Sequence, residues 1–431
     1  MNFLNEHTML IALGIFVLMY VFMLIFSKKR MFVALGAAAL MVILQVLPLA
    51  DVLPNINWNV IMMISGTMGI VALFIDSKMP SRLADLMLTK VPNACWAIVV
   101  LSVFSGLISA FVDNVATVLM LAPVGLAVCK KIKSNPVPAI IAIAVSSNLQ
   151  GAATLVGDTT SILLGGYAKM SFVDFIFWQG KPSIFWAVEL GAAGTLFILL
   201  FIFRKDKQKI TPDSITEVND YVPAFALVFT VVALIVASFF EIPYIDDIKN
   251  GLICLTICVL LIIRTCIKQK GAKPIKAVAE QFDYETVLTL CGLFVVVASI
   301  TKAGIIDVIA NWFAGIGDGN VFLLYTIIVF ASVALSAFID NIPYVAAMLP
   351  VVEVLSQKLG ISPVVLYFGL LSGATLGGNI TPFGASANVT AIGILKKNGY
   401  SVKNSDFFKI GIPFTLTAVL IGYVFIWFVW G

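Results

Sequence analysis

Apolar residues fill the chain in long blocks that are separated by short polar connections. A helix needs about 20 apolar residues to cross the roughly 30 Å hydrocarbon core of a bilayer, and most of these blocks reach or approach that length. The weak alternating segments typical of outer-membrane barrels do not occur, so the pattern predicts membrane-spanning α-helices. The blocks cover residues 9–26, 31–50, 59–76, 96–128, 137–168, 183–203, 221–240, 250–263, 284–301, 321–356, 362–395 and 410–430.

Two of these twelve blocks, 96–128 and 321–356, are too long for one crossing and contain the dipeptide Asp-Asn in their middle. We interpret each as a re-entrant hairpin that enters and leaves the membrane on the same side. Asp113-Asn114 and Asp340-Asn341 then form the two hairpin tips. The other ten blocks remain as spanning segments.

The distribution of Lys and Arg supports the two hairpins. With the N-terminus outside, all but five of the 27 basic residues fall in cytoplasmic connections, as the positive-inside rule requires. A simple crossing in place of either hairpin would reverse every later segment and destroy this asymmetry. We therefore expect a multi-pass protein of the cell (inner or plasma) membrane with both termini extracytoplasmic. The five exceptions are Lys169, Lys181, Lys249, Lys302 and Lys358.

The composition agrees with a membrane protein, since 61% of residues are hydrophobic and 12% are charged, against about 25% charged in soluble domains. The net charge of +4 resides in short connections, so we expect a lipid bilayer and no nucleic acid as partner. The sequence has neither a Walker loop nor a dinucleotide fingerprint, and no nucleophile–base pair is evident. We therefore expect neither an enzyme nor an ATP-driven pump, and no resident cofactor.

A single constant offset, the one that carries Asp113 onto Asp340, superposes the two halves of the chain without a gap over their most distinctive stretch. Each half holds an odd number of spans, five, so the second repeat must be inverted relative to the first. The sequence thus predicts an all-α polytopic fold of about ten transmembrane helices plus two re-entrant hairpins, arranged as two inverted-topology repeats with broken helices. The predicted parts are an N-terminal half (1–203), a charged cytoplasmic linker (204–220) and a C-terminal half (221–431). The matched pairs include Ser109 and Ser336, Ala110 and Ala337, Asp113 and Asp340, Asn114 and Asn341, Pro123 and Pro350, Gly151 and Gly378, Thr154 and Thr381, and Gly157 and Gly384.

Polar and small residues interrupt the blocks 137–168 and 362–395, which predicts a broken helix in each. Unwound backbone is tolerated inside a membrane only where it is buried in protein or lines a cavity. Hydroxyl and carbonyl oxygens there suit Na⁺, whereas N–H groups near Gly157 and Gly384 suit an anionic or polar substrate. The candidate binding residues are Asn148, Thr154, Gly157, Asp158 and Thr159 in the first half, and Asn379, Thr381, Gly384, Ser386 and Asn388 in the second.

Asp113, Asp158 and Asp340 are predicted carboxylates inside the bilayer. Each costs at least about 2.5–3.5 kcal/mol against lipid, so each is expected to face the protein interior and bind a cation or a proton. The alternative for Asp113 and Asp340 is that they only cap the second helix of their hairpin. Asp158 has Ala385 as its counterpart, which suggests that the two half-sites differ. The oxygens expected to hold Na⁺ belong to Asp113, Asn114, Thr154, Asp340, Asn341 and Thr381.

These residues resemble the ion transporter superfamily, in the citrate-transporter-like branch of ArsB metalloid permeases, NhaD sodium/proton antiporters and the melanosomal P protein. The resemblance rests on SAFVDNVATVLMLAPV (109–124), SAFIDNIPYVAAMLPVV (336–352), GAATLVGD (151–158) and GGNITPFGASANV (377–389). The related dicarboxylate carriers, the divalent anion sodium symporters, place Ser-Asn-Thr at the tips, and this chain departs from that pattern. The resemblance implies a homodimer whose hairpins and broken helices move as an elevator against a static scaffold.

Three functions remain open at this point. No Arg or Lys lies within the predicted pore segments, so a fixed counter-charge for a multivalent anion is not evident. We therefore expect a secondary transporter of a small inorganic ion, by cation- or proton-coupled antiport (Na⁺/H⁺ or metalloid/H⁺ exchange). The alternatives are an anion permease (oxyanion or carboxylate) coupled to Na⁺ or H⁺, and an ion channel on the same fold.

Overall fold

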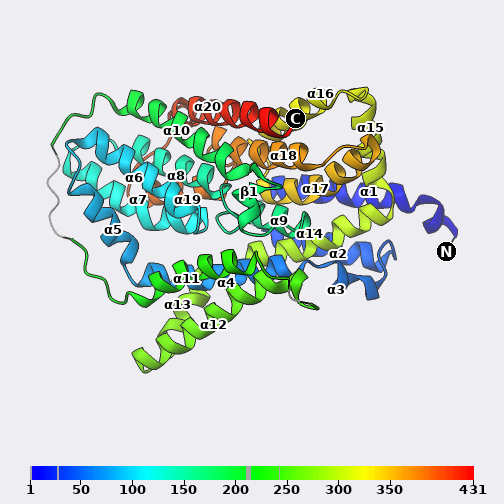
Figure 1. Cartoon of the computed structure of the whole chain (residues 1–431), viewed down its shortest axis with the longest axis horizontal. Coiled ribbons are helices and arrows are strands. Elements are labelled where there is room, and N and C mark those ends of the chain that lie inside the picture. The colour runs from blue at the N-terminus through cyan, green and yellow to red at the C-terminus, as the bar shows by residue number, and fades with distance from the viewer. Residues whose placement is uncertain (1, 27–28, 210–214, 242) are drawn as a thin grey trace.

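The computed structural model describes residues 2–26, 29–209, 215–241 and 243–431, and the side chains of 7–26 within the first of these ranges. The described chain is almost entirely helical (Figure 1). The α-helices are α1 (Asn2–Ile25), α2 (Arg30–Ile43), α3 (Val52–Asn55), α4 (Trp58–Asp76), α5 (Met79–Leu88), α6 (Ala94–Ser109), α7 (Asn114–Lys131), α8 (Pro136–Gly151), α9 (Thr159–Tyr167), α10 (Ile184–Phe203), α11 (Val222–Ala237), α12 (Lys249–Gln269), α13 (Lys273–Gln281), α14 (Tyr284–Lys302), α15 (Ile305–Gly317), α16 (Val321–Ser336), α17 (Asn341–Leu359), α18 (Val364–Gly377), α19 (Ser386–Lys397) and α20 (Asn404–Trp430). Short 3-10 helices are η2 (Leu49–Asp51), η3 (Val173–Phe175), η4 (Asp246–Ile248) and η5 (Gly378–Ile380), and β1 (Phe177–Trp178) pairs antiparallel with β2 (Lys181–Pro182).

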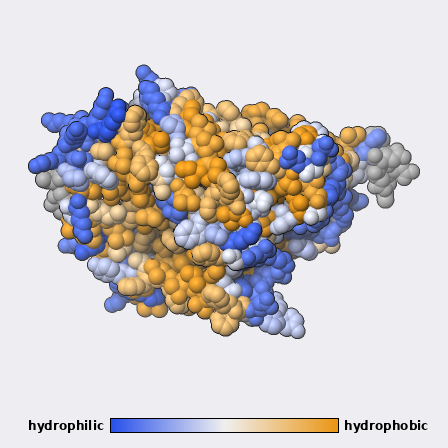
Figure 2. Space-filling model, turned by 45° about the horizontal axis from the view of Figure 1, so that its top comes forward, coloured by the Kyte–Doolittle hydropathy of each residue, from blue (hydrophilic) through white to orange (hydrophobic). Residues whose placement is uncertain are grey.

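Within the described residues, eight helices are long and apolar enough to cross a bilayer, or nine if the pair α15–α16, bent by 120°, counts as one more. Two of the eight, α7 and α17, are the second helices of the predicted hairpins. The predicted spans at 31–50 and 221–240 appear as the shorter apolar helices α2 and α11. On the face in Figure 2, apolar side chains cover most of the middle and hydrophilic ones gather toward the ends. The chain is thus a multi-pass membrane protein, as predicted.

The helix boundaries confirm the internal repeat. Helix α6 covers 94–109 and α16 covers 321–336, so the offset that carries Asp113 onto Asp340 relates them at both ends. The starts of α7 and α17 and of α9 and α19 differ by the same offset. The predicted hairpins and broken helices therefore exist as α6–α7, α16–α17, α8–α9 and α18–α19, with ends close to those expected from the sequence.

The two repeats are inverted relative to each other. The pair α5–α6 and the pair α15–α16 lie at opposite ends of the molecule, so the hairpins enter from opposite sides (Figure 1). Residues related by the repeat also meet: Asn148 Nδ2 donates to the carbonyl of its counterpart Thr375, and Gly191 packs against its counterpart Ala418. Contact between a residue and its own counterpart is the property of a two-fold relation.

The helices pack into two groups, each of which takes elements from both halves of the chain. In one group, which we call the scaffold, α4 packs on α12, α2 on α14, and α11 and α13 on α4, with α1 beside α2. In the other, which we call the core, the hairpins and broken helices pack together with α10 and α20. Helices α9 and α17 of the core touch α4 and α14 of the scaffold. The site described below lies at this boundary.

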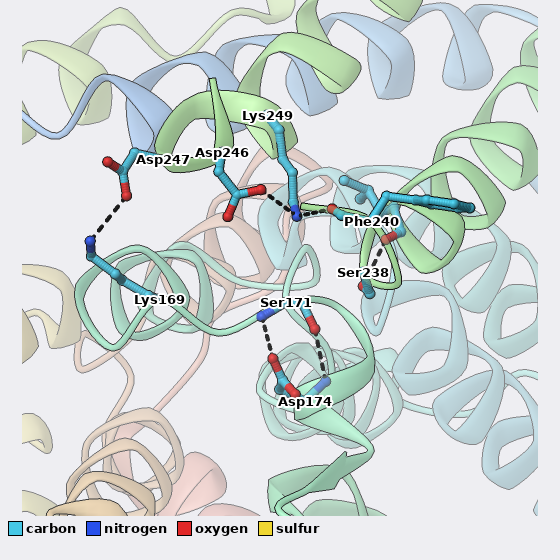
Figure 3. A network of polar contacts seen from close by, with 9 residues as sticks. Lys169, Ser171, Asp174, Ser238, Phe240, Asp246, Asp247 and Lys249 are labelled. Atoms are coloured by element: carbon cyan, nitrogen blue, oxygen red, sulfur yellow. Dashed lines mark hydrogen bonds and ion pairs between the residues drawn. The ribbon is translucent and has the colours of Figure 1, made fainter. Parts of the chain in front are cut away.

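Ion pairs hold four of the five lysines that the sequence placed outside the cytoplasm. Lys169 Nζ lies 3.0 Å from Asp247 Oδ1, and Lys249 Nζ lies 2.8 Å from Asp246 Oδ1 (Figure 3). The first pair joins the loop after α9 to η4, and the second joins η4 to the first residue of α12. The other two pairs are Lys302 with Asp51, at 3.0 Å, and Lys358 with Asp307, at 3.2 Å.

The predicted linker 204–220 is described only in part, since 210–214 lie outside the described residues. Its last residues dock on the scaffold and on α5. Thr216 N donates to Asp85 Oδ2 at 2.9 Å, and Asn219 N donates to the carbonyl of Ser77 at 3.0 Å. Asp220 pairs with Arg264 and Lys268 of α12. This end of the linker is therefore anchored.

Acid is expected to release this anchor. Burial raises the pKa of Asp220, but hydrogen bonds and charge from Arg264 and Lys268 outweigh it and hold the pKa below its ordinary 3.8. A depressed pKa contributes stability above the unfolded value, and that stability is lost as the pH falls through the folded value. Hydrogen exchange of 215–222 should thus rise only below about pH 4. The variant Asp220→Asn should exchange faster at neutral pH, and unchanged exchange would contradict this anchor.

Candidate functional site

Asp113 and Asp340 occupy the N-cap positions of α7 and α17. Asp113 Oδ2 accepts from Val115 N at 3.0 Å and from Ala116 N at 3.1 Å, and Asp340 Oδ1 accepts from Ile342 N at 3.0 Å. The capping considered as an alternative is therefore real at both tips. Capping occupies one oxygen of each carboxylate, however, and Asp340 uses its second oxygen for an ion pair. Asp340 therefore caps α17 with one carboxylate oxygen and pairs with Arg30 through the other.

The loops of the broken helices are fitted against the hairpin tips. The hydroxyls of Thr154 and Thr381 donate to the carbonyls of Ala110 and Ala337, at equivalent places in the two repeats. A Cβ on Gly157 would lie 2.5–2.8 Å from three carbonyl oxygens, and one on Gly384 would lie 2.6 Å from the oxygen of Gly378. Only glycine permits this approach.

This packing shows where the half-helices near Gly157 and Gly384 begin. Both glycines are themselves buried against backbone. The half-helix that follows Gly384 starts at the exposed Ser386, the first residue of α19. Its counterpart Thr159, the first residue of α9, is 6% exposed.

Three buried asparagines connect the first tip to the broken helices of both repeats. Asn114 Nδ2 donates to Asn148 Oδ1 at 2.9 Å, and Asn148 Nδ2 donates to Asn379 Oδ1 at 3.1 Å. Asn379 in turn donates to the carbonyl of Val145 at 2.9 Å. Since each amide is satisfied by protein, Asn148 and Asn379 position the site and hold the repeats together.

Replacing Asn148 by Leu is expected to destabilise the fold. The change leaves Asn114 Nδ2, Asn379 Oδ1 and the Thr375 carbonyl without their partner. Each buried group left unpaired costs about 1–3 kcal/mol, so the total loss should reach about 3 kcal/mol or more. Thermal unfolding in detergent measures it, with the exposed Asn398→Leu as a control expected to change little. Equal melting of the two variants would show that the asparagine chain does not hold the repeats together.

Asp158 and Asn388 lie deeper in the core. Asp158 is 4% exposed, and its Oδ2 accepts from Thr160 Oγ1 at 2.8 Å. Thr160 Oγ1 is 3.0 Å from Thr375 Oγ1, so Asp158 also connects to the second repeat. Asn388 Nδ2 donates to the carbonyls of Gly378 and Thr381, and its buried Oδ1 finds no partner in the described part of the chain. An unpaired buried oxygen is available to a cation.

A cavity of about 680 Å³, which we call the tip cavity, lies between the two hairpin tips and the scaffold. Of the predicted residues, Asp340 and Ser386 line it, and Val115 and Ile342 bring in the starts of α7 and α17. The scaffold adds residues that the sequence analysis did not assign to the site. They are Arg30, Asp283, Glu285, Thr286 and Thr289.

No Arg or Lys was found within the predicted pore segments, but Arg30, from outside those segments, lines the tip cavity. It is the first residue of α2 and forms an ion pair with Asp340 Oδ2, at 26% and 8% side-chain exposure respectively. The sequence analysis counted Arg30 only as a topology signal. Because the partners are 310 residues apart, no local pattern announces this contact.

Acidic groups nevertheless dominate the cavity. Asp113 interacts electrostatically with Asp283, the N-cap of α14, and Glu285 interacts with Asp283, Arg30 and Asp340. Three carboxylates, those of Asp283, Glu285 and Asp340, line the cavity with one guanidinium, which gives a net charge of 1 − 3 = −2 when all are ionised. Among the described residues these carboxylates form no group tight enough to hold a metal ion by themselves.

A second cavity of about 460 Å³ lies at the other boundary between core and scaffold. It is lined by Asn57, Leu163 and Lys302, among others. Leu163 is the repeat counterpart of Thr390, which lines the tip cavity. The fold thus places equivalent surfaces of the two repeats beside two separate cavities.

Inverted repeats, paired hairpins and broken helices around a central cavity define a secondary transporter. The chain belongs to the citrate transporter family (CitMHS), which it matches over residues 18–355 and 245–431. It is 29% identical over 427 residues to an uncharacterized transporter of Mycobacterium tuberculosis, covering 97% of both chains. It is 24% identical to the P protein of Mus musculus, over 90% of this chain and 56% of that protein. The crystal structure of the YdaH transporter of Alcanivorax borkumensis has the same fold, with a TM-score of 0.60 at 14% identity over 87% of this chain and 86% of that one. The predicted branch, which includes the P protein, is confirmed.

Proposed function

We propose that this chain is a cation- or proton-coupled antiporter of a small inorganic ion, and that the tip cavity is its transport site. The observation that carries the proposal is the convergence of carboxylates from the second hairpin tip and from the start of scaffold helix α14 on one cavity, beside the first tip, whose Asp113 interacts with Asp283. A net charge of −2 repels a multivalent anion and attracts H⁺ or Na⁺. The coupling ion binds at Asp113 and Asp340, and Ser386 lines the same cavity as Asp340.

The cavity is reached from one side of the membrane at a time. Asp340 belongs to the core and Arg30 to the scaffold, so their ion pair must break whenever the core moves. The second cavity, beside Leu163, supplies the opposite access route. An elevator movement of the core along the scaffold fits both features. We further propose a homodimer in the inner membrane, with both termini outside.

One observation favours a second candidate, an anion permease. Arg30 lies in the tip cavity beside the N-termini of α17 and α19, and helix N-termini attract anions. If a cation or proton neutralises Asp340, Arg30 becomes available to an oxyanion or a carboxylate. In this case ion and anion move in the same direction.

Reconstituted protein separates the two candidates. A pH-sensitive dye inside proteoliposomes reports proton movement when Na⁺, Li⁺, arsenite or citrate is added outside. Antiport predicts that an added cation or metalloid drives protons out and that citrate has no effect. Proton uptake that requires citrate or another anion supports the permease instead. No response to any gradient would contradict both.

A further inference from the structure

Glu189 lies in the second turn of α10, is half-buried, and lines a cavity that is separate from the tip cavity. This lateral cavity, of about 190 Å³, lies among α6, α8, α10 and α20. Its lining includes Leu107, Ser146, Gln150, Thr195 and Phe414. Glu189 is the one titratable or charged residue among the described residues that line it. Within the described residues, this carboxylate forms no ion pair with a Lys or Arg, and no basic residue lines the cavity.

The polar groups around Glu189 are held in place by the fold. Gln150 is 4% exposed and donates its Nε2 to Glu189 Oε2 at 3.0 Å. Its Oε1 is buried and has no hydrogen-bond partner in the described part of the chain. The amide lies against Gly106, where any side chain would collide with Oε1. Ser146 and Thr195, 6% and 3% exposed, add two hydroxyl oxygens to the cavity lining.

The second repeat shows that the fold does not require this arrangement. The repeat counterparts of Ser146, Gln150 and Thr195 are Gly373, Gly377 and Gly422, and that of Glu189 is Leu416. There the glycines let helices touch: a Cβ on Gly373 or Gly377 would lie 2.5 Å from a carbonyl oxygen of α16. One repeat therefore has a tight helix contact where the other has four oxygen-bearing side chains and a cavity.

We propose that Glu189, with Gln150, Ser146 and Thr195, forms a second site for a monovalent cation, taking H⁺ or Na⁺. An ionised carboxylate inside a bilayer is costly, and here a bound cation is the available means of neutralising it. Carboxylate, amide and hydroxyl oxygens are hard ligands of the kind that bind Na⁺. Gln150 Oε1, which has no partner among the described residues, becomes one of these ligands when the side-chain amide rotates by half a turn and exchanges its oxygen and nitrogen. The site stands independently of the tip cavity and of the direction of transport.

A carbodiimide that modifies protonated carboxyl groups in apolar surroundings tests this site in the purified full-length protein. Peptide mass spectrometry is expected to find Glu189 modified at low pH. In the proton arm, raising the pH without Na⁺ reduces the modification several-fold. In the Na⁺ arm, replacing choline chloride by NaCl at constant pH and ionic strength does the same. Protection in either arm supports the site and identifies its ion. No modification, or modification that responds to neither change, overturns it.

Variants distinguish this site from the tip cavity. Glu189→Gln should abolish the modified peptide, whereas Glu353→Gln, which changes a carboxyl hydrogen-bonded to Tyr367 and Gln357, should leave Glu189 protected as in the wild type. Asp113→Asn should also leave it unchanged, because Asp113 lies at the other site. Gln150→Leu should weaken the protection of Glu189 by Na⁺. If the Gln150→Leu protein does not fold, Thr195→Val serves as the test variant in its place. If Glu189 is protected but the protein shows no antiport activity, the second site stands and the proposed function is wrong.

Discussion

Replacing Asp113 by Asn is expected to reduce ion-coupled transport by about 100-fold or more, equivalent to a loss of about 2.7 kcal/mol at the coupling step. Asp113 lies at a hairpin tip, interacts with Asp283, and has no basic partner among the described residues. Asn keeps an oxygen that caps α7 through Val115 and Ala116, so the fold is preserved while the charge is removed. The initial rate of proton or Na⁺ flux in proteoliposomes measures the effect.

Asp174→Asn is a matched control for this prediction. Asp174 also accepts a backbone N–H, from Ser171 at 2.7 Å, but it lies in η3 and lines none of the three cavities (Figure 3). It should transport at the wild-type rate. If Asp113→Asn also transports normally, the tip carboxylate serves only as a helix cap and the assignment fails.

Replacing Arg30 by Gln is the second change with a large expected effect. It leaves the Asp340 carboxylate, 8% exposed, without its ion pair. Because Arg30 is itself 26% exposed, the loss of stability should be about 1–3 kcal/mol, less than for a fully buried pair. Transport should fall as well, since the unpaired carboxylate binds its cation too tightly to release it.

A double-mutant cycle isolates this pair. Asp340→Asn alone should also lose stability and transport, because Arg30 then remains unpaired in the cavity. The double variant Arg30→Gln/Asp340→Asn should recover part of the stability, with a coupling energy of about 1 kcal/mol or more. Additive losses in thermal unfolding would contradict a direct interaction between scaffold and core.

The sequence predicted the fold well because the fold depends on patterns that membranes enforce. Apolar block lengths located the helices, and the matched Asp-Asn, Pro, Gly and Thr positions located the repeat. The constant offset between the matched positions then reproduced helix starts to the residue, at Asn114 and Asn341 and at Thr159 and Ser386. The positive-inside count and the odd number of spans together fixed the inversion, which the opposite hairpins of Figure 1 bear out.

The site was predicted only on its core side. Asp340 and Ser386 line the tip cavity as expected, because both belong to the repeated motif. Arg30, Asp283 and Glu285 come from scaffold helices α2 and α14 or their caps, outside that motif. Their place in the site follows from packing between distant segments. A run of basic residues at a helix start is an ordinary topology signal. The sequence around Arg30 therefore does not indicate that Arg30 also pairs with Asp340 in the tip cavity.

Some of the predicted ligands also have structural partners. Thr154 and Thr381 use their hydroxyls to hold the hairpin tips, and Asn148 joins the two repeats. Hydroxyl and amide side chains look alike in sequence whether they bind an ion or bind the backbone. Only the hydrogen-bond partners separate these two uses.

The central claim is that the tip cavity is the transport site and faces one side of the membrane at a time. The most direct test places a single cysteine at Ser386, an exposed residue of the cavity, after removal of the six native cysteines. A membrane-impermeant thiol reagent is applied from either side of proteoliposomes of defined orientation. The account predicts reaction from one side only, and a shift to the other side when the ion gradient is reversed. Equal reaction from both sides at once, or from neither side under any gradient, would contradict it.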